Sequence, residues 1–354
     1  MVLIGAGHAS LQVITDWQDR DVELTLISDR RVAYYSGMVP GWLAGEYALD
    51  DLSIDLERLT ARSRARLICG AALRVDPNER SIETAGGQRH SYRVALIDTG
   101  SQTSIPGVTN THDRAANTVP ARPIGALIDH FENTPLCAGE RVTVVGAGAG
   151  GVELAFACTA RGAAVTLIDA VGLMAGASAA LIRQVRRQCE ALGTVVELGS
   201  GVAAVDADRV MLENGATVDF DRLIWATGAE PTALLRASPL PCDERGFIPV
   251  RPTLQVAGFD DLLVAGDAAS WMAGPALSKA GVYAVRAGPV AAHNLRAIVR
   301  DRSLREFRPQ RDFLKLLNLG DGTAIASRFG LALRSRTMRS LKDRIDRRWL
   351  ARFA

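Results

Sequence analysis

Short apolar runs that end in glycine-rich turns mark the first part of the chain. Val2–Ile4 leads into Gly5–Ser10, and Val142–Val145 leads into Gly146–Gly151. An apolar run of this length bounded by glycine is typical of a strand buried in a parallel sheet, and the small residues that follow allow a tight turn into a helix. The pattern therefore predicts a strand–turn–helix unit at each of these two places.

The two units belong to an internal repeat. Sliding the first copy by 141 positions (146 − 5) places Leu24–Ile27 on Val165–Ile168 without a gap. Each copy then passes through a stretch rich in strand formers and closes on an apolar run that ends in Thr-Gly, at Val94–Gly100 and Arg222–Gly228. A third apolar run, Leu262–Ala265, ends in Gly-Asp. Two such units with one spacing predict an α/β protein with two Rossmann-like, dinucleotide-binding domains.

The order of these elements predicts that one domain is inserted into the other. We expect the first domain over 1–115 and 235–300, the second over 116–234, and a basic helical tail over 301–354. A segment rich in Pro, Thr and Arg, 106–123, is the expected crossing between the domains.

Composition supports a folded chain and argues against several classes of protein. Apolar residues make up 48% and charged residues 23%, values typical of a globular protein. The five cysteines are odd in number and scattered, which indicates reduced thiols in the cytoplasm rather than a disulfide framework. No apolar run approaches the roughly 18 residues of a membrane-spanning helix. Because Met1 leads directly into a strand, no secretion signal is expected, and no His, Cys or acid spacing predicts a metal site.

The glycine turns and the acids after the second strands point to dinucleotides. Such a turn lets a pyrophosphate approach the N-terminus of the following helix, and an acid at the end of the next strand binds ribose hydroxyls. The second turn has all three glycines of the motif, whereas the first has Ser10 in the third place. Asp169 favours NADH over NADPH, because a carboxylate repels a 2′-phosphate. In the first copy either Ser28 or Asp29 fills the ribose position, and the spacing does not decide between them.

Four features together resemble the pyridine nucleotide–disulfide oxidoreductase superfamily: the two glycine turns, the strand end at Ala226–Gly228, and the segment Leu263–Ala269. The resemblance covers 1–300 and implies that the first unit holds the ADP part of FAD and the second holds NAD(P)H. It also implies that Gly266 and Asp267 contact the flavin ribitol and pyrophosphate.

Three further segments resemble one subgroup of that superfamily. Tyr35–Gly41, Lys279–Pro289 and Leu341–Arg348 are similar to the type II NADH dehydrogenase-like flavoprotein that some organisms fuse to selenide, water dikinase. This resemblance implies fold and cofactor more than substrate. The cysteine pairs on which the superfamily's disulfide reductases depend are absent from the expected places. Tyr35–Gly41 contains no Cys, and Cys158 has no partner in a Cys-x-x-Cys motif in the nucleotide domain, so thiol relay chemistry is disfavoured.

We single out two residues for the chemistry. The resemblance places Glu153 beside the flavin–nicotinamide pair, where it would position the nicotinamide. The alternative is an acid that only complements the dipole of its helix. Lys279 would add positive charge near the flavin N1/O2 edge, at a helix expected to start over 275–281, or would be a solvated surface lysine. The residues predicted to contact the cofactors are Gly5, Gly7, Ser10, Ser28, Asp29, Pro40, Thr99, Gly100, Gly266, Asp267 and Ala280 for FAD, and Gly146, Gly148, Gly151, Asp169 and Gly228 for NAD(P)H.

The tail over 301–354 holds fourteen Lys or Arg and six Asp or Glu. From 334 onward it predicts an amphipathic helix with an apolar stripe at Met338, Leu341, Ile345, Trp349 and Phe353. Such a helix can lie in a membrane interface, on the inner face of the membrane, or can dock on the protein itself or on a second subunit of a homodimer. Nucleic-acid binding is disfavoured because no recognised nucleic-acid fold accompanies the arginines.

The sequence therefore predicts an FAD-dependent oxidoreductase that takes hydride from NAD(P)H, with NADH favoured, and passes electrons to a quinone or another small acceptor. Two alternatives remain open. One is a reductase for a soluble carrier or for a selenium or sulfur compound. The other is a non-catalytic, FAD-binding sensor or assembly module.

Overall fold

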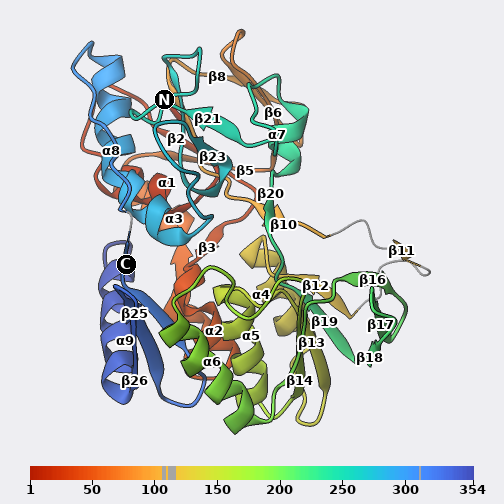
Figure 1. Ribbon diagram of the computed structural model, residues 1–354. Coiled ribbons are helices and arrows are strands. Elements are labelled where there is room, and N and C mark those ends of the chain that lie inside the picture. Colours follow the sequence, from red (N-terminus) through yellow and green to blue (C-terminus); the bar gives the residue numbers. More distant parts are fainter. Residues whose placement is uncertain (106–108, 111–116, 311) are drawn as a thin grey trace.

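The computed structural model describes residues 1–105, 109–110, 117–310 and 312–354, so the predicted crossing over 106–123 lies partly outside the described residues. Among the described residues two parallel sheets of five strands form the two halves of the molecule, which lie one above the other in Figure 1. The predicted α/β fold with two Rossmann-like sheets is confirmed. Both glycine turns connect the central strand of a sheet to a helix.

The first sheet takes its strands from both ends of the sequence. Its order is β22 (Leu262–Val264), β9 (Ala95–Ile97), β1 (Val2–Ile4), β2 (Thr25–Ser28) and β5 (Arg66–Cys69), with every neighbour parallel. Helices α1 (His8–Thr15) and α8 (Gly281–Val299) pack against each other beside this sheet. Helix α8 begins at Gly281, the last residue of the segment 275–281 in which a helix start was predicted. Residues 275–280 form no regular helix.

The second sheet has the order β12 (Thr118–Pro120), β19 (Arg222–Trp225), β13 (Arg141–Val145), β14 (Ala164–Asp169) and β15 (Val195–Leu198). It carries α4 (Ile124–Asn133), α5 (Ala149–Ala160) and α6 (Ala179–Leu192). A short antiparallel pair, β10 (Gln102–Thr103) with β20 (Ala229–Glu230), links the two halves.

Smaller elements complete both halves. They are β3 (Val32–Tyr34), β4 (Ser53–Asp55), α2 (Val39–Leu43), α3 (Leu56–Arg62), β6 (Ala72–Asp76), β7 (Ser81–Thr84), β8 (Arg89–Ser91), β11 (Thr109–Asn110), β16 (Val202–Val205), β17 (Arg209–Leu212), β18 (Thr217–Asp219), α7 (Ala233–Ala237), β21 (Ile248–Val250) and β23 (Ala269–Trp271). The short 3-10 helices are η1 (Ser36–Met38), η2 (Leu49–Leu52) and η3 (Gly266–Ala268).

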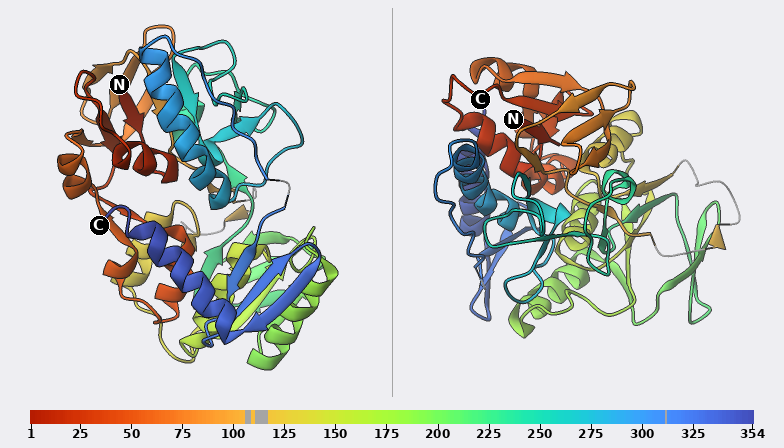
Figure 2. Two further views of the ribbon diagram at one scale, coloured as in Figure 1. Left: turned by 90° about the vertical axis from the view of Figure 1, so that its left-hand side faces the viewer. Right: turned by 90° about the horizontal axis from the view of Figure 1, so that it is seen from above.

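The tail contains more than the predicted helix. Strands β24 (Lys315–Asn318), β25 (Ala324–Arg328) and β26 (Leu331–Ser335) form an antiparallel sheet, and α9 (Arg336–Leu350) packs against it. The left view of Figure 2 shows α9 lying across these strands with its C-terminal end pointing toward the first half. None of the helices in the described residues is both long and apolar enough to pass through a bilayer.

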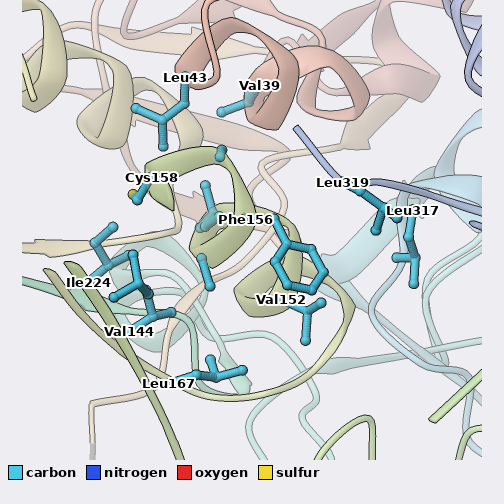
Figure 3. Close-up of a cluster of buried hydrophobic side chains, with 14 of the residues drawn as sticks. Val39, Leu43, Val144, Val152, Phe156, Cys158, Leu167, Ile224, Leu317 and Leu319 are labelled. Carbon is cyan, nitrogen blue, oxygen red and sulfur yellow. The ribbon is translucent and has the colours of Figure 1, made fainter. Parts of the chain in front are cut away.

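One hydrophobic core joins segments that are far apart in the sequence. Val39 and Leu43 of α2 lie with Phe156 of α5 and with Leu317 and Leu319 of the tail (Figure 3). Phe156 is fully buried, and burying aromatic and aliphatic side chains together stabilises a fold by about 1.5 to 3 kcal/mol per residue. This core holds the N-terminal segment, the second half and the tail in one arrangement.

Candidate cofactor and electron-transfer site

The second glycine turn has no room for larger residues. Gly146 has φ +111°, and a Cβ on Gly151 would lie 1.8 Å from the Gly146 carbonyl oxygen. Around Gly148, by contrast, no heavy atom lies within 4 Å of a Cβ position, so the turn is open at the N-terminus of α5. These are the conditions for close approach of a dinucleotide pyrophosphate.

Asp169 ends β14 next to this turn. Its carboxylate accepts hydrogen bonds from the backbone amides of Ala147 at 2.7 Å and of Val171 and Gly172 at 2.8 Å each. A carboxylate has about four acceptor positions, so it can still accept a ribose hydroxyl. Gly228 lies three residues after β19, the strand that pairs with β13 on its other side, and also has an open Cβ position.

The first glycine turn is built differently. Gly5 has φ +89°, and a Cβ there would lie 2.7 Å from the Asp98 carbonyl oxygen. The Asp98 carboxylate accepts a hydrogen bond of 2.7 Å from the Ser10 amide and is 3% exposed. Burial raises the pKa of Asp98 to about 7, although the amides of Ser10 and Ala9 act in the opposite direction.

The strand ends beside the first turn form a cradle that fits FAD. Thr99 has a buried hydroxyl without a hydrogen-bond partner among the described residues, and Gly100, at φ +69°, has an open Cβ position. Asp267 accepts a 3.0 Å hydrogen bond from the Ser101 hydroxyl. Ala280 is the residue that precedes α8, so its neighbourhood is the N-terminus of that helix. Backbone and hydroxyl donors of this kind suit a pyrophosphate and a ribitol chain.

The two ribose candidates of the first copy differ in exposure. Ser28 is buried, and its hydroxyl accepts a 3.3 Å bond from the Arg30 amide. Asp29 is exposed. The structure thus leaves the Asp29 carboxylate more accessible to a ribose, while Ser28 serves the local turn.

Two other predicted site residues, Lys279 and Pro40, make contacts within the protein. The Lys279 ammonium donates a 2.7 Å hydrogen bond to the Ala269 carbonyl and lies 3.6 Å above the ring of Phe247. Burial lowers the pKa of Lys279 to about 8. Pro40 is buried in the first turn of α2.

Glu153 lies on α5, two residues after the last glycine of the second turn. Its Oε1 accepts a 2.8 Å hydrogen bond from the amide of Asn318 on β24. Burial raises the pKa of Glu153 to about 7, and the charge of Lys342 and the Asn318 amide lower it in part. A carboxyl with a pKa near neutrality can hold or release a proton under physiological conditions, as functional acids often do.

The tail brings polar residues to the same region that sequence reasoning missed. Lys342 donates 2.6 Å and 2.8 Å hydrogen bonds to the Gly37 carbonyl and to Asp346, and Asp346 accepts a 2.9 Å bond from the Tyr35 hydroxyl. Lys342 and Asp346 are 7% and 5% exposed. A buried ion pair needs good hydrogen bonds on both partners, and this pair has them. The sequence signal was the i, i+4 spacing of a lysine and an aspartate, together with their place in a segment that resembles the subgroup.

Aromatic stacking fixes the end of α9 over the first glycine turn. The Trp349 ring stacks on Tyr35 with centroids 4.5 Å apart and lies 4.9 Å from the ring of His8. Burial lowers the pKa of His8 to about 4, so this imidazole is neutral. Trp349 and Phe353 are buried, whereas Ile345 is 45% exposed. Of the three positions proposed for the tail helix, the structure therefore shows docking on the protein itself.

Metal and thiol chemistry receive no support from the geometry. Within the described residues no group of three or more His, Cys, Asp or Glu side chains is placed to hold a metal ion. All five cysteines are free, and burial raises the pKa of Cys158 to about 12, which makes its thiolate inaccessible near neutral pH.

Comparison with known proteins agrees with this geometry. Residues 1–289 match the family described as pyridine nucleotide-disulphide oxidoreductase. The chain belongs to this family. It is an FAD-dependent enzyme that oxidises NAD(P)H and passes electrons on to an acceptor.

Individual relatives match between about three quarters and nearly all of the chain. A type II NADH:quinone oxidoreductase of Staphylococcus saprophyticus is 23% identical over 98% of this chain and 94% of its own length. A nitric oxide reductase FlRd-NAD(+) reductase of Aeromonas salmonicida is 27% identical over 77% of this chain and 71% of its own length. The fold matches that of NDH2 from Plasmodium falciparum, with a TM-score of 0.81, 13% identity, and coverage of 99% of this chain and 96% of that one. The predicted similarity to type II NADH dehydrogenases is thereby confirmed, as a similarity in sequence and fold. The similarity to the module fused to selenide, water dikinase stays a prediction.

Proposed function

We propose that this protein is an NADH dehydrogenase that reduces a quinone-like acceptor through FAD. The observation that carries the proposal is that Glu153 lies where the nucleotide-binding helix α5 meets the tail. This titratable acid, at the start of the nucleotide-binding helix α5, bonds to the tail strand β24 and lies within the electrostatic reach of Lys342. The full-length similarity to a type II NADH:quinone oxidoreductase supports the same acceptor class. Bound FAD accepts hydride from the nicotinamide and passes its electrons on.

The residues of this chain have distinct roles in the proposal. Gly146, Gly148 and Gly151 admit the nucleotide pyrophosphate, and Asp169 binds the adenosine ribose and disfavours a 2′-phosphate. Glu153 orients the nicotinamide and holds a proton at its carboxyl. On the FAD side, Gly5, Gly7, Thr99, Gly100, Gly266, Asp267 and Ala280 bind the cofactor. This assignment keeps the predicted domains: an FAD domain over 1–115 and 235–300, a nucleotide domain over 116–234, and a tail over 301–354.

The placement of Lys279 favours an indirect role. Its ammonium bonds to Ala269, in the strand that follows η3, and so it fixes the segment that leads from Asp267 to α8. We propose Lys279 as a residue that positions the N-terminus of α8. A Lys279→Met variant is expected to weaken FAD binding, whereas Lys279→Arg retains a donor.

We propose that the protein meets the cytoplasmic face of the membrane through the β25–β26 hairpin. Its apolar residues Phe329, Leu331 and Leu333 are 73%, 74% and 60% exposed. Phe329 also has φ +50°, a conformation that costs energy for a bulky side chain, and Arg328 stacks on its ring. Exposed apolar side chains beside arginines suit an anionic lipid surface, with the apolar groups inserted toward the acyl chains and the arginines at the headgroups.

Flotation with lipid vesicles tests the membrane contact. The protein is expected to float with vesicles that contain phosphatidylglycerol and much less with pure phosphatidylcholine vesicles. The double variant Phe329→Ser, Leu331→Ser should lose flotation and keep its fold, because both side chains project into solvent. Flotation that is unchanged in this variant contradicts the assignment of the hairpin.

The acceptor is tested by reoxidation. Enzyme reduced by NADH without oxygen is mixed with a water-soluble quinone, and the return of flavin absorbance is followed in a stopped-flow instrument. The proposal expects reoxidation within the turnover time. If a soluble iron–sulfur or flavin carrier reoxidises the enzyme quickly and the quinone does not, the acceptor assignment is wrong and the soluble-carrier alternative takes its place.

A further inference from the structure

The two glycine turns differ at one buried position that the sequence analysis did not weigh. In the second copy the strand beside the turn ends in Ala226, whose Cβ is 3.2 Å from the Cβ position of Gly151. In the first copy the equivalent residue is Asp98, and a Cβ on Gly7 would lie 2.5 Å from its carboxyl carbon. A carboxylate thus fills a place that a methyl group fills in the nucleotide-binding copy.

This carboxylate lies between two of the predicted FAD contacts. Asp98 Oδ1 is 3.1 Å from the Cβ position of Gly266, and Oδ2 accepts the hydrogen bond from the Ser10 amide. Ser10 is in the first turn of α1, so Asp98 binds amide donors at the helix N-terminus where a dinucleotide pyrophosphate is bound in this motif. Asp98 is 3% exposed, so water does little to screen its charge.

The charged groups around Asp98 do not neutralise it. Asp267 of η3 adds negative charge and raises the pKa of Asp98 further, and the main influences on this pKa include no cation. His8 of α1 is neutral, because its pKa is lowered to about 4. The cations of this region, Arg122 and Lys279, act on Asp267, with Arg122 Nε 4.0 Å from its carboxylate.

We propose that Asp98 couples FAD binding to the uptake of a proton, so that the protein binds FAD tightly only when this carboxyl is neutral. The two negative charges of the pyrophosphate and an ionised Asp98 would compete for the same helix N-terminus. Protonation removes this repulsion. The proposal rests on FAD binding at the first turn and is independent of the identity of the acceptor.

The direction of the pH dependence follows from linkage. Burial already raises the pKa of Asp98 to about 7 in the free protein. In the proposal, the negative charge of bound FAD raises this pKa further. Well below pH 7 the carboxyl is neutral in both forms, and the affinity for FAD is constant. Above pH 7 binding requires proton uptake, so the dissociation constant rises by up to roughly tenfold per pH unit, the limit for one proton.

The experiment measures FAD binding by the protein stripped of cofactor, from pH 6 to 8.5, through the quenching of FAD fluorescence. Wild type is expected to bind roughly tenfold or more weakly at pH 8.5 than at pH 6.5. Asp98→Asn, which keeps size and the acceptor for Ser10, and Asp98→Ala, which copies Ala226, should bind FAD with little pH dependence. The control Asp21→Asn, whose side chain is 90% exposed in the same βα unit, should behave as wild type.

Proton uptake provides the second readout. Calorimetric titration with FAD at pH 7.5, in two buffers of different ionisation enthalpy, should show uptake of a fraction of a proton by wild type and none by Asp98→Asn. Thermal unfolding of each cofactor-free variant verifies that it is folded. If wild type binds FAD with the same affinity at every pH, or if Asp98→Asn retains the wild-type pH dependence and proton uptake, the proposal is wrong. Neither result would depend on NADH oxidation, which tests the proposed function separately.

Discussion

Replacing Glu153 by Gln should stabilise the protein, and more so at high pH. The pKa of the folded-state carboxyl is raised from 4.5 to about 7, and each pKa unit corresponds to about 1.4 kcal/mol. Ionised Glu153 therefore costs at most about 3 kcal/mol of unfolding free energy. Gln has nearly the same shape, and its carbonyl oxygen can still accept the Asn318 amide.

The pH window follows from the sign of the perturbation. The folded protein holds the Glu153 proton up to about pH 7 and the unfolded chain releases it near pH 4.5, so wild-type stability falls as pH rises through this interval. Gln does not titrate. The difference in unfolding free energy between Glu153→Gln and wild type should therefore be smallest near pH 5 and reach about 2 to 3 kcal/mol at pH 8.

Urea unfolding followed by tryptophan fluorescence, from pH 5 to pH 8, measures this difference. Other titrating groups are common to both proteins and cancel in the comparison. A Glu190→Gln variant, which changes an exposed carboxylate on α6, controls for the loss of charge and should give no pH-dependent gain. A constant difference between Glu153→Gln and wild type across the pH range would refute the burial argument.

The remaining predictions concern the nucleotide site and the tail. Asp169→Ala should raise the KM for NADH on the order of tenfold, because a hydrogen bond to a charged acceptor contributes about 1.5 to 3 kcal/mol. The KM for NADPH should change much less, and steady-state kinetics with both nucleotides checks this. Lys342→Met should destabilise the fold by about 3 kcal/mol, because it leaves Asp346 buried without its cation. Adding Asp346→Asn should recover part of this loss, and a double-mutant cycle measured by urea unfolding checks both expectations. Trp349→Ala should cost about 3 kcal/mol and expose the C-terminal helix to limited proteolysis.

The fold was predictable because its signal is local and repeated. Val2–Ile4 and Val142–Val145 are short apolar runs followed at once by glycine, and the equal spacing of the second strands shows that both belong to one kind of unit. Parallel strands of this type are buried on both faces, so their sequences are continuous apolar runs. The three strands of the tail were missed because Lys315–Asn318 and its neighbours alternate weakly and are stabilised by packing on helices α5, α6 and α9.

The site was predictable only in part, because only some of its residues are placed by local sequence signals. Residues next to a glycine turn, such as Asp169 and Glu153, take their place from local geometry. The contacts of Lys342 with Gly37 and of Asp346 with Tyr35 join positions more than 300 residues apart in sequence, which no periodicity can reveal. The apolar stripe predicted for α9 was partly wrong, because Ile345 faces outward. The charged pair Lys342 and Asp346 faces inward instead, because Gly37 and Tyr35 satisfy its hydrogen bonds.

Anaerobic reduction of the FAD-loaded protein tests the central claim most directly. NADH and, separately, NADPH are mixed with the protein in a stopped-flow instrument, and flavin absorbance near 450 nm is followed. The account predicts rapid bleaching with NADH, slower bleaching with NADPH, and a large loss of rate with NADH in Glu153→Ala and Asp169→Ala. If neither nucleotide bleaches the flavin of the wild-type protein, the assignment as an NADH dehydrogenase is contradicted.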